Sequence, residues 1–170
     1  MRLTASTWVI SDYHFGHKNI PEYEKRPEEF AELIVDRWNQ TVNKQDQILV
    51  LGDLTFLNKE NTRHYTDRMR GKKYLVRGNH DGHTVGWYAD TGFTVVEPMY
   101  KVFTNSKGKF PILFTHEPVL DLPANWYNIH GHIHWGTHRE YDLTNRHYNV
   151  SCEPLDYLPL PIYDIIAHFK

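Results

Sequence analysis

Residues that could bind a metal ion recur where short apolar runs of the chain end. The pairs Asp12-Tyr13-His14 and His132-Ile133-His134 each place two such side chains on one face of an extended segment. Carboxylate, imidazole and amide oxygen suit first-row ions such as Mn²⁺, Fe and Zn²⁺. Seven candidate ligands are too many for one four-coordinate ion, but they fit two ions if one carboxylate bridges. The candidates are Asp12, His14, Asp53, Asn79, His116, His132 and His134.

The apolar runs that precede these residues are typical of β-strands. Most are continuous and rich in β-branched residues, which is expected for strands that are covered on both faces. Ligand-binding loops of open α/β sheets leave the carboxyl ends of the strands, so the candidates are expected to meet at one edge. The predicted strands span residues 7–11, 47–51, 73–77, 93–97, 100–104, 110–115, 127–130 and 148–151.

Three segments are predicted to be helical. Residues 27–42 carry Pro and Glu at the start and then apolar residues at helical spacing. Residues 61–70 form a second helix that stops at Gly71, and residues 161–169 form a short terminal helix. Strands and helices alternate in the first half and strands dominate the second half. The pattern predicts an α/β fold with mixed sheets, and a single domain over residues 1–170.

The composition excludes several classes of protein. The chain has 40% hydrophobic and 24% charged residues, which are values of a globular and not a disordered protein. Cys152 is the single cysteine, so an internal disulfide and a thiolate-rich metal site are excluded. A signal peptide or an apolar membrane span is not recognisable, which favours a cytoplasmic location. The formal charge is −2 and no run of basic residues is present, which disfavours a nucleic-acid partner.

The ordered motifs Asp-x-His, Gly-Asp, Gly-Asn-His-Asp, His-x-Pro and Gly-His-x-His resemble the calcineurin-like metallophosphoesterase superfamily. The resemblance covers residues 7 to about 151 and is closest to the small, stand-alone bacterial and phage phosphoesterases. It implies two mixed sheets packed as a sandwich and flanked by helices. It also implies that Asp12, His14 and His134 hold one metal ion, that Asn79, His116 and His132 hold the other, and that Asp53 bridges them.

The resemblance also implies roles for His80 and Asp81. In the family, His80 is not a metal ligand but lies beside the scissile phosphate, and Asp81 orients it. Two metal ions (Mn, Fe, Zn or Ni) lower the pKa of a shared water, so that hydroxide attacks phosphorus. His80 then protonates the departing oxygen as general acid. The expected activity is hydrolysis of a small phosphodiester or phosphomonoester, for which a nucleotide is the leading candidate.

Residues around the motifs bear on the substrate. Serine/threonine protein phosphatases of this superfamily continue after Gly-Asp with a phosphate-binding Arg, whereas Leu54-Thr55-Phe56-Leu57 follows here. A phosphoprotein substrate is therefore disfavoured. His17 and Arg77 are candidates for substrate binding, although each also has an ordinary structural interpretation, as a surface histidine and as a residue at the edge of the core. Aromatic residues adjoin the motifs and could stack on a nucleobase or simply fill the core.

Two alternatives to a small-molecule phosphoesterase remain at this point. One is a nuclease-type phosphodiesterase that acts on the backbone of nucleic acid. The other is a catalytically silent scaffold of the same fold that binds proteins. Every motif position holds a residue competent for the chemistry, which disfavours the scaffold. Aromatic residues in loops 82–90 and 123–135 would be compatible with a dimer.

Overall fold

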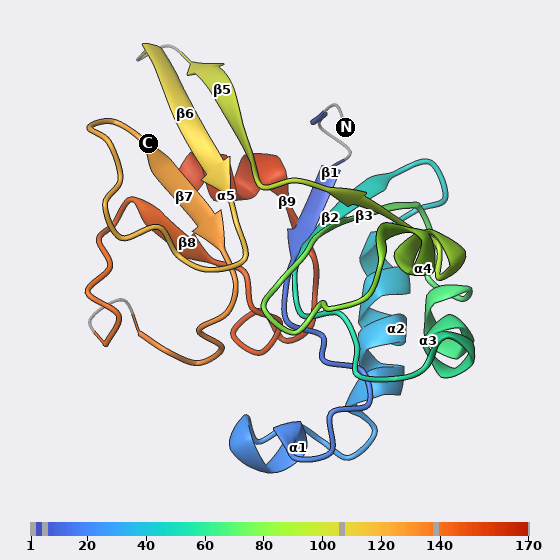
Figure 1. Ribbon diagram of the computed structural model, residues 1–170. Helices are drawn as coiled ribbons and strands as arrows, with labels where there is room; N and C mark the ends of the chain where they lie inside the picture. The colour runs from blue at the N-terminus through green and yellow to red at the C-terminus, as the bar shows by residue number, and fades with distance from the viewer. Residues whose placement is uncertain (1–2, 5–6, 106–107, 138–139, 170) are drawn as a thin grey trace.

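The computed structural model describes residues 3–4, 7–105, 108–137 and 140–169 (Figure 1). One sheet has five strands in the order β4-β3-β2-β1-β9. Its first four strands in sequence are parallel to one another, and the short β9 runs antiparallel beside β1. These strands are β1 (Thr7–Ile10), β2 (Gln47–Leu51), β3 (Lys72–Val76), β4 (Phe93–Val96) and β9 (Leu160–Pro161).

The second sheet has four strands in the order β5-β6-β7-β8. Strand β5 is antiparallel to β6, whereas β6, β7 and β8 are parallel. Both sheets are therefore mixed, as the sequence predicts. The strands are β5 (Met99–Asn105), β6 (Gly108–Phe114), β7 (Tyr127–His130) and β8 (His147–Asn149).

The two sheets pack face to face, and the alternation along β2 shows how. Leu49 and Leu51 enter a core that also contains Ile112 and Phe114 of the second sheet. Ile48 and Val50, which point the other way, belong to a second core that Trp38 shares. Strand β2 is buried on both faces, which explains why its sequence is continuously apolar.

Helices α2, α3 and α4 lie together along the outer face of the five-stranded sheet (Figure 1). Helix α2 presents Phe30, Ile34, Val35 and Trp38 to that face. Helix α5 instead places Ile162, Ile165 and Ile166 in the core between the sheets. The helices are α1 (Ile20–Tyr23), α2 (Phe30–Thr41), α3 (Lys59–Thr66), α4 (Val85–Asp90) and α5 (Ile162–His168). The predicted class, an α/β sandwich of two mixed sheets flanked by helices, is confirmed.

Some predicted boundaries differ from the structure. The helix predicted over residues 61–70 spans Lys59–Thr66, because the side chain of Asn58 accepts a hydrogen bond from the amide of Asn61 and caps its start. Helix α1, helix α4 and the two-residue strand β9 are not predicted by the sequence patterns. All three are short, so their apolar residues define no clear period.

The topology aligns the ends of five strands at one edge of the sandwich. Asp12, Asp53 and Asn79 follow the parallel strands β1, β2 and β3, and His116 and His132 follow β6 and β7. A bridge between Ser11 and Ser151 joins the two sheets at this edge. Among the helices that the structure describes, none combines the length and apolar character that a membrane span requires.

Candidate metal centre

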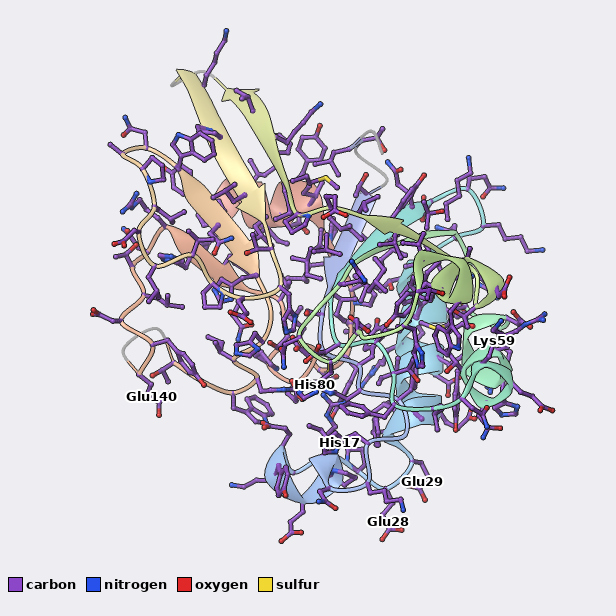
Figure 2. All side chains as sticks on the ribbon, in the orientation of Figure 1. His17, Glu28, Glu29, Lys59, His80 and Glu140 are labelled. Carbon is purple, nitrogen blue, oxygen red and sulfur yellow. The ribbon has the colours of Figure 1, made fainter. Side chains whose placement is uncertain are left out.

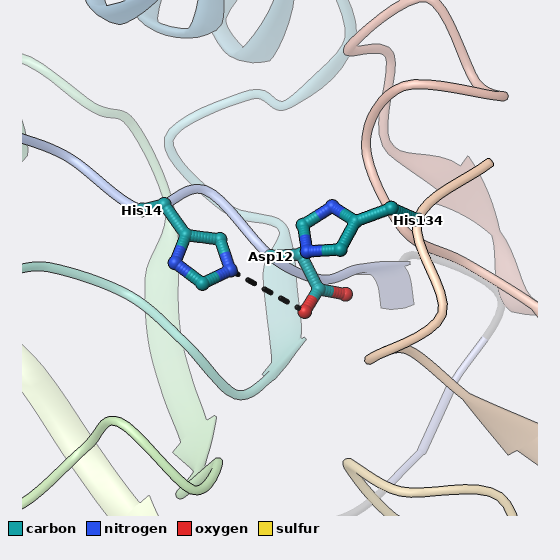
Figure 3. Close-up of side chains that lie close together, drawn as sticks. All are labelled: Asp12, His14 and His134. Atoms are coloured by element: carbon teal, nitrogen blue, oxygen red, sulfur yellow. Dashed lines mark ion pairs between the residues drawn. The ribbon is translucent and has the colours of Figure 1, made fainter. Parts of the chain in front are cut away.

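The seven predicted ligands converge at this edge in two groups that share Asp12. Its carboxylate lies within 4.8 Å of ligand atoms of His14 and His134 (Figure 3). It lies equally within 4.8 Å of ligand atoms of Asp53 and His116. Asn79 and His132 join the second group, because the Oδ1 atom of Asn79 lies 2.9 Å from Nε2 of His116 and 3.1 Å from Nδ1 of His132.

The carboxylate of Asp53 lies between the two groups. Its Oδ2 atom is 3.5 Å from Nε2 of His14 and 3.4 Å from Nε2 of His116. The other oxygen, Oδ1, accepts a hydrogen bond from the backbone amide of His80 at 2.9 Å. One oxygen is thus held by the protein, and the other faces a histidine of each group. Oδ1 of Asp12 is placed similarly, 3.8 Å from Nε2 of His14 and 4.0 Å from Nδ1 of His116, so both carboxylates lie between the two groups.

Buried polar atoms without hydrogen-bond partners mark the first group. Oδ2 of Asp12 accepts hydrogen bonds from the amide of His132 and the hydroxyl of Ser151, both at 2.9 Å. In contrast, Oδ1 of Asp12 and both ring nitrogens of His14 are buried without a hydrogen bond. Buried polar atoms are seldom left in this state, because an unmade hydrogen bond costs about 1–3 kcal/mol. Divalent metal ions fit these donor atoms.

The backbone is strained at most of these positions. Positive φ angles, which residues other than glycine rarely adopt, occur at five of the seven predicted ligands. Each such residue costs of order 1–3 kcal/mol, and the rest of the structure must hold it in place. The five are Asp12 (64°), His14 (51°), Asp53 (54°), His132 (72°) and His134 (46°).

Two glycines allow the ligand loops to approach one another closely. A Cβ atom at Gly78 would collide with Oδ1 of Asp53, and one at Gly131 would collide with Oδ2 of Asp12 and with the hydroxyl of Ser11. A residue with a side chain therefore does not fit at the glycine of the Gly-Asn motif or at that of the Gly-His motif.

The charges of the cluster stabilise one another. Burial acts to raise the pKa of Asp12, but the contact with His14 and the charges of His116 and His134 lower the pKa overall. Burial opposes protonation of His116, but its contact with Asp53 and the charges of Asp12 and Asp53 raise its pKa to about 9. Buried carboxylates in this chain thus attract positive charge, which metal ions would supply.

His134 is held by a buried network that the sequence motifs do not reveal. Its Nδ1 atom lies 2.8 Å from Oε1 of Glu153, so that Nε2 is free to face the first group. The guanidinium of Arg26 pairs with the same carboxylate and donates hydrogen bonds to the carbonyls of Asp12 and Tyr13, both at 2.6 Å. Arg26 and Glu153 are almost completely buried. Carboxylates that orient metal-binding histidines in this way raise the basicity of the ligand.

Glu153 and His134 also form a third candidate metal group with Glu24. Because Nδ1 of His134 is already hydrogen-bonded to Glu153, we interpret this group as support for the first one. Glu153 lies 19 residues beyond His134 and belongs to no motif, so no sequence signal could identify it.

His80 is exposed beside the cluster. Asp81, which is predicted to orient His80, is buried and contacts other groups. Both oxygens of Asp81 accept hydrogen bonds, from the amides of Asp53 (2.7 Å), Gly78 (2.8 Å) and Leu54 (3.1 Å) and from the hydroxyl of Tyr88 (3.1 Å). Within the described part of the chain, no hydrogen bond joins Asp81 to the imidazole of His80. Asp81 therefore holds the loops that carry Asp53 and Asn79, and the orientation of His80 by Asp81 stays a prediction.

The two candidate substrate-binding residues lie beside different ligand groups. His17 is partly buried, with its ring 5.8 Å from that of His14. Burial, together with the neighbouring His14 and His80, lowers the pKa of His17. Arg77 is exposed and lines a hollow of about 470 Å³ with Asn79 and His116.

Comparisons with known proteins agree with this geometry. Residues 5–163 match the family described as calcineurin-like phosphoesterase. An uncharacterized protein of Methanocaldococcus jannaschii is 30% identical over 94% of this chain and 88% of its own length. The gene 66 protein of Mycobacterium phage L5 is 26% identical over 96% and 95%. The crystal structure of a protein of unknown function from Aquifex aeolicus has a TM-score of 0.71 and 25% identity, and the match covers 95% of this chain and 97% of that one.

Proposed function

Because the chain belongs to the calcineurin-like phosphoesterase family, we propose that it hydrolyses a small phosphodiester or phosphomonoester with two divalent metal ions. Asp12, His14 and His134 would hold one ion, and Asn79, His116 and His132 the other. The observation that carries the proposal is the position of Asp53, whose Oδ2 atom lies about equally far from a histidine of each group. Mn, Fe, Zn and Ni all suit these ligands.

When bound, two such ions provide positive charge for the phosphoryl oxygens and lower the pKa of a water molecule. The chain's own residues set up the geometry for this chemistry. Asp81 holds the amides of Asp53 and Gly78, and Glu153 orients His134. Both buried carboxylates are positioning residues, since neither faces the space where a phosphate would lie.

His80 is the residue we assign to proton transfer. Its backbone amide is anchored on Asp53, while its exposed ring lies 5.7 Å from the ring of His14 and 5.1 Å from that of Phe56. From this place the imidazolium can donate a proton to the oxygen that departs from phosphorus. General acid catalysis of this kind contributes about 10²- to 10⁴-fold to the rate.

The strain at the ligands favours an enzyme over a silent scaffold. Five residues in left-handed backbone conformations reduce the stability of the fold, and a scaffold would gain nothing from them. The functional side chains at these positions account for the cost, because strain of this kind clusters at active sites.

The test is hydrolysis of a chromogenic phosphodiester and the corresponding monoester by chelator-stripped protein that is resupplied with Mn²⁺, Zn²⁺ or Ni²⁺. Metal should restore turnover, and Asp53→Asn should abolish it and reduce the number of bound ions per chain. His80→Ala should keep both ions and lose about 10²- to 10⁴-fold in turnover. His83→Ala is the matched control, because His83 is exposed nearby but stacks on Trp87, away from the cluster. Absence of bound metal, or unchanged turnover in Asp53→Asn, would refute the proposal.

A further inference from the structure

A hollow of about 340 Å³ adjoins His14 and His80. It is lined by Gly16, His17, Lys18, Asn19 and Phe56. Figure 2 shows His17 and His80 together near the lower edge of the molecule, between the strand ends and α1. The phosphoryl chemistry proposed above uses none of the five lining residues.

Phe56 is the prominent member of this hollow. Its side chain is 44% exposed, although it is a large apolar residue. The ring lies parallel to that of His14 (centroids 5.6 Å apart, interplanar angle 16°) and meets the ring of His17 edge-on at 4.6 Å. It therefore extends the aromatic surface that begins at the metal-binding histidine out to the solvent.

The loop that carries Phe56 is well anchored. The amide of Phe56 donates to the carbonyl of Phe15 at 2.8 Å, and Thr55 pairs with Phe15 in a parallel bridge. The hydroxyl of Thr55 lies 3.1 Å from that of Thr62 on α3. The neighbours Leu54 and Thr55 are buried, so the exposure of Phe56 is set by a fixed backbone.

We propose that Phe56, with His17 and Lys18, forms a subsite that stacks the base of a nucleotide substrate. This inference rests on the proposed function. Planar bases stack on exposed aromatic rings regardless of their identity. His17 and Asn19 offer hydrogen-bonding groups at the edge of the ring, and Lys18 offers a positive charge.

The subsite lies on the leaving-group side of the phosphate. Phe56 contacts the ring of His80, which donates its proton to the departing oxygen. In the step, a water oxygen forms a bond to phosphorus, the bond from phosphorus to the nucleoside oxygen breaks, and that oxygen takes the proton of His80. The products are a nucleoside hydroxyl and a phosphate that keeps its other substituent.

A second hollow favours a diester as the substrate. Arg77, Asn79 and His116 line this space beside the second ligand group, where another substituent of the phosphate can lie. A monoester would occupy one hollow only. We therefore infer that the substrate class is a nucleotide-bearing phosphodiester.

The experiment compares the affinities of adenosine 5′-phosphate and ribose 5-phosphate, which differ only in the base, for metal-loaded protein by calorimetry. The base should strengthen binding about 5- to 150-fold, which corresponds to the usual range for one stacked base. Phe56→Ala should reduce this ratio to near one, and Phe56→Trp should restore it. Tyr163→Ala is the matched control, because Tyr163 is 49% exposed on α5 and lies outside both hollows.

The outcomes separate the subsite from the enzyme. A ratio that stays high in Phe56→Ala, or a ratio near one in the unchanged protein that still hydrolyses simple diesters, would refute the subsite alone. Failure of both ligands to bind, together with no hydrolysis of any ester, would refute the subsite and the proposed function together.

A salt series tests whether the stacked base belongs to a small nucleotide or to a nucleic acid strand. Arg77 shares its hollow with Glu117, and Glu24 lies beside His134, so the surroundings favour a small substrate over a polyanion. Turnover of a dinucleotide should change little between 50 and 200 mM salt. A fall of about 10³-fold or more over this range on a single-stranded oligonucleotide, with preference for it over the dinucleotide, would overturn the small-substrate assignment.

Discussion

The two ligand groups of the metal centre are supported in different ways. Behind the first group, His134 is fixed by Glu153, and Glu153 is fixed by Arg26, which also binds the backbone of Asp12. In the second group, the side chains of Asn79 and His132 are more exposed and contact one another and His116. His116 is held by the backbone carbonyl of Leu51, 2.7 Å from its Nδ1 atom. One group is thus held by a buried ion pair from distant parts of the chain, while the other is held by a backbone carbonyl and by contacts among its own members.

This difference indicates different tasks. A site whose ligands are fixed in advance loses little entropy on binding an ion, so the first ion should bind more tightly. The second group borders the hollow lined by Arg77. The predictions that follow test this contrast.

The largest expected effect is on stability. Arg26→Met removes the cation from a buried ion pair and leaves Glu153 without its charged partner, which costs about 3–5 kcal/mol of the free energy of unfolding. Arg63→Met removes the exposed pair with Asp67 and should cost less than about 1 kcal/mol. Urea unfolding of the metal-free proteins measures both. If the two variants were equally stable, the buried network would not support the first group.

The next effect is on metal affinity. Glu153→Gln keeps the shape of the side chain but weakens its hold on His134, so the affinity of the first ion should fall about 10- to 100-fold. Glu60→Gln changes an exposed carboxylate on α3, outside both ligand groups, and should leave both ions bound as before. Isothermal titration calorimetry with the metal ion measures the affinity of each ion. An equal loss for both ions in Glu153→Gln would contradict the separation of the two groups.

The smallest expected effect concerns Tyr88, whose hydroxyl contacts the carboxylate of Asp81 that holds the loop of Asp53. Tyr88→Phe removes one hydrogen bond to Asp81 and should cost about 0.5–1.5 kcal/mol of unfolding free energy. Turnover should change by no more than a few fold, because the three backbone amides still hold Asp81. Tyr163→Phe alters an exposed phenol on α5 and serves as the control. A loss of turnover as large as that of His80→Ala would return Asp81 to a direct role beside His80.

The convergence of the candidate ligands at one edge could be predicted from the sequence because they follow recognisable strands. Asp12 and Asp53 end apolar runs of four or five residues, and the parallel order of β1 and β2 brings those ends together. The same reasoning cannot find Arg26 and Glu153, which are 127 residues apart and lie in loops without a period. The ion pair between them forms because the segment after β8 lies beside the end of β1, where Ser151 pairs with Ser11.

The site also shows where motif reasoning is incomplete. Asp81 follows His80 directly, yet its carboxylate turns away to meet the amides of Asp53 and Gly78. Tyr13 and Tyr88, which adjoin the motifs in sequence, are buried in the core and cannot stack on a substrate. Phe56 is exposed beside the cluster instead, because its neighbours Leu54 and Thr55 fill the interior.

The left-handed backbone at five ligands has a consequence for how the chain can change. On backbone grounds alone, glycine or asparagine would be the favoured residue at Asp12, His14, Asp53, His132 and His134. Metal binding demands carboxylate and imidazole at the same places, so the two requirements compete at every one of them. Glycine at any one of the five would relieve the backbone strain and remove a candidate ligand, so it is expected to raise stability while weakening metal binding.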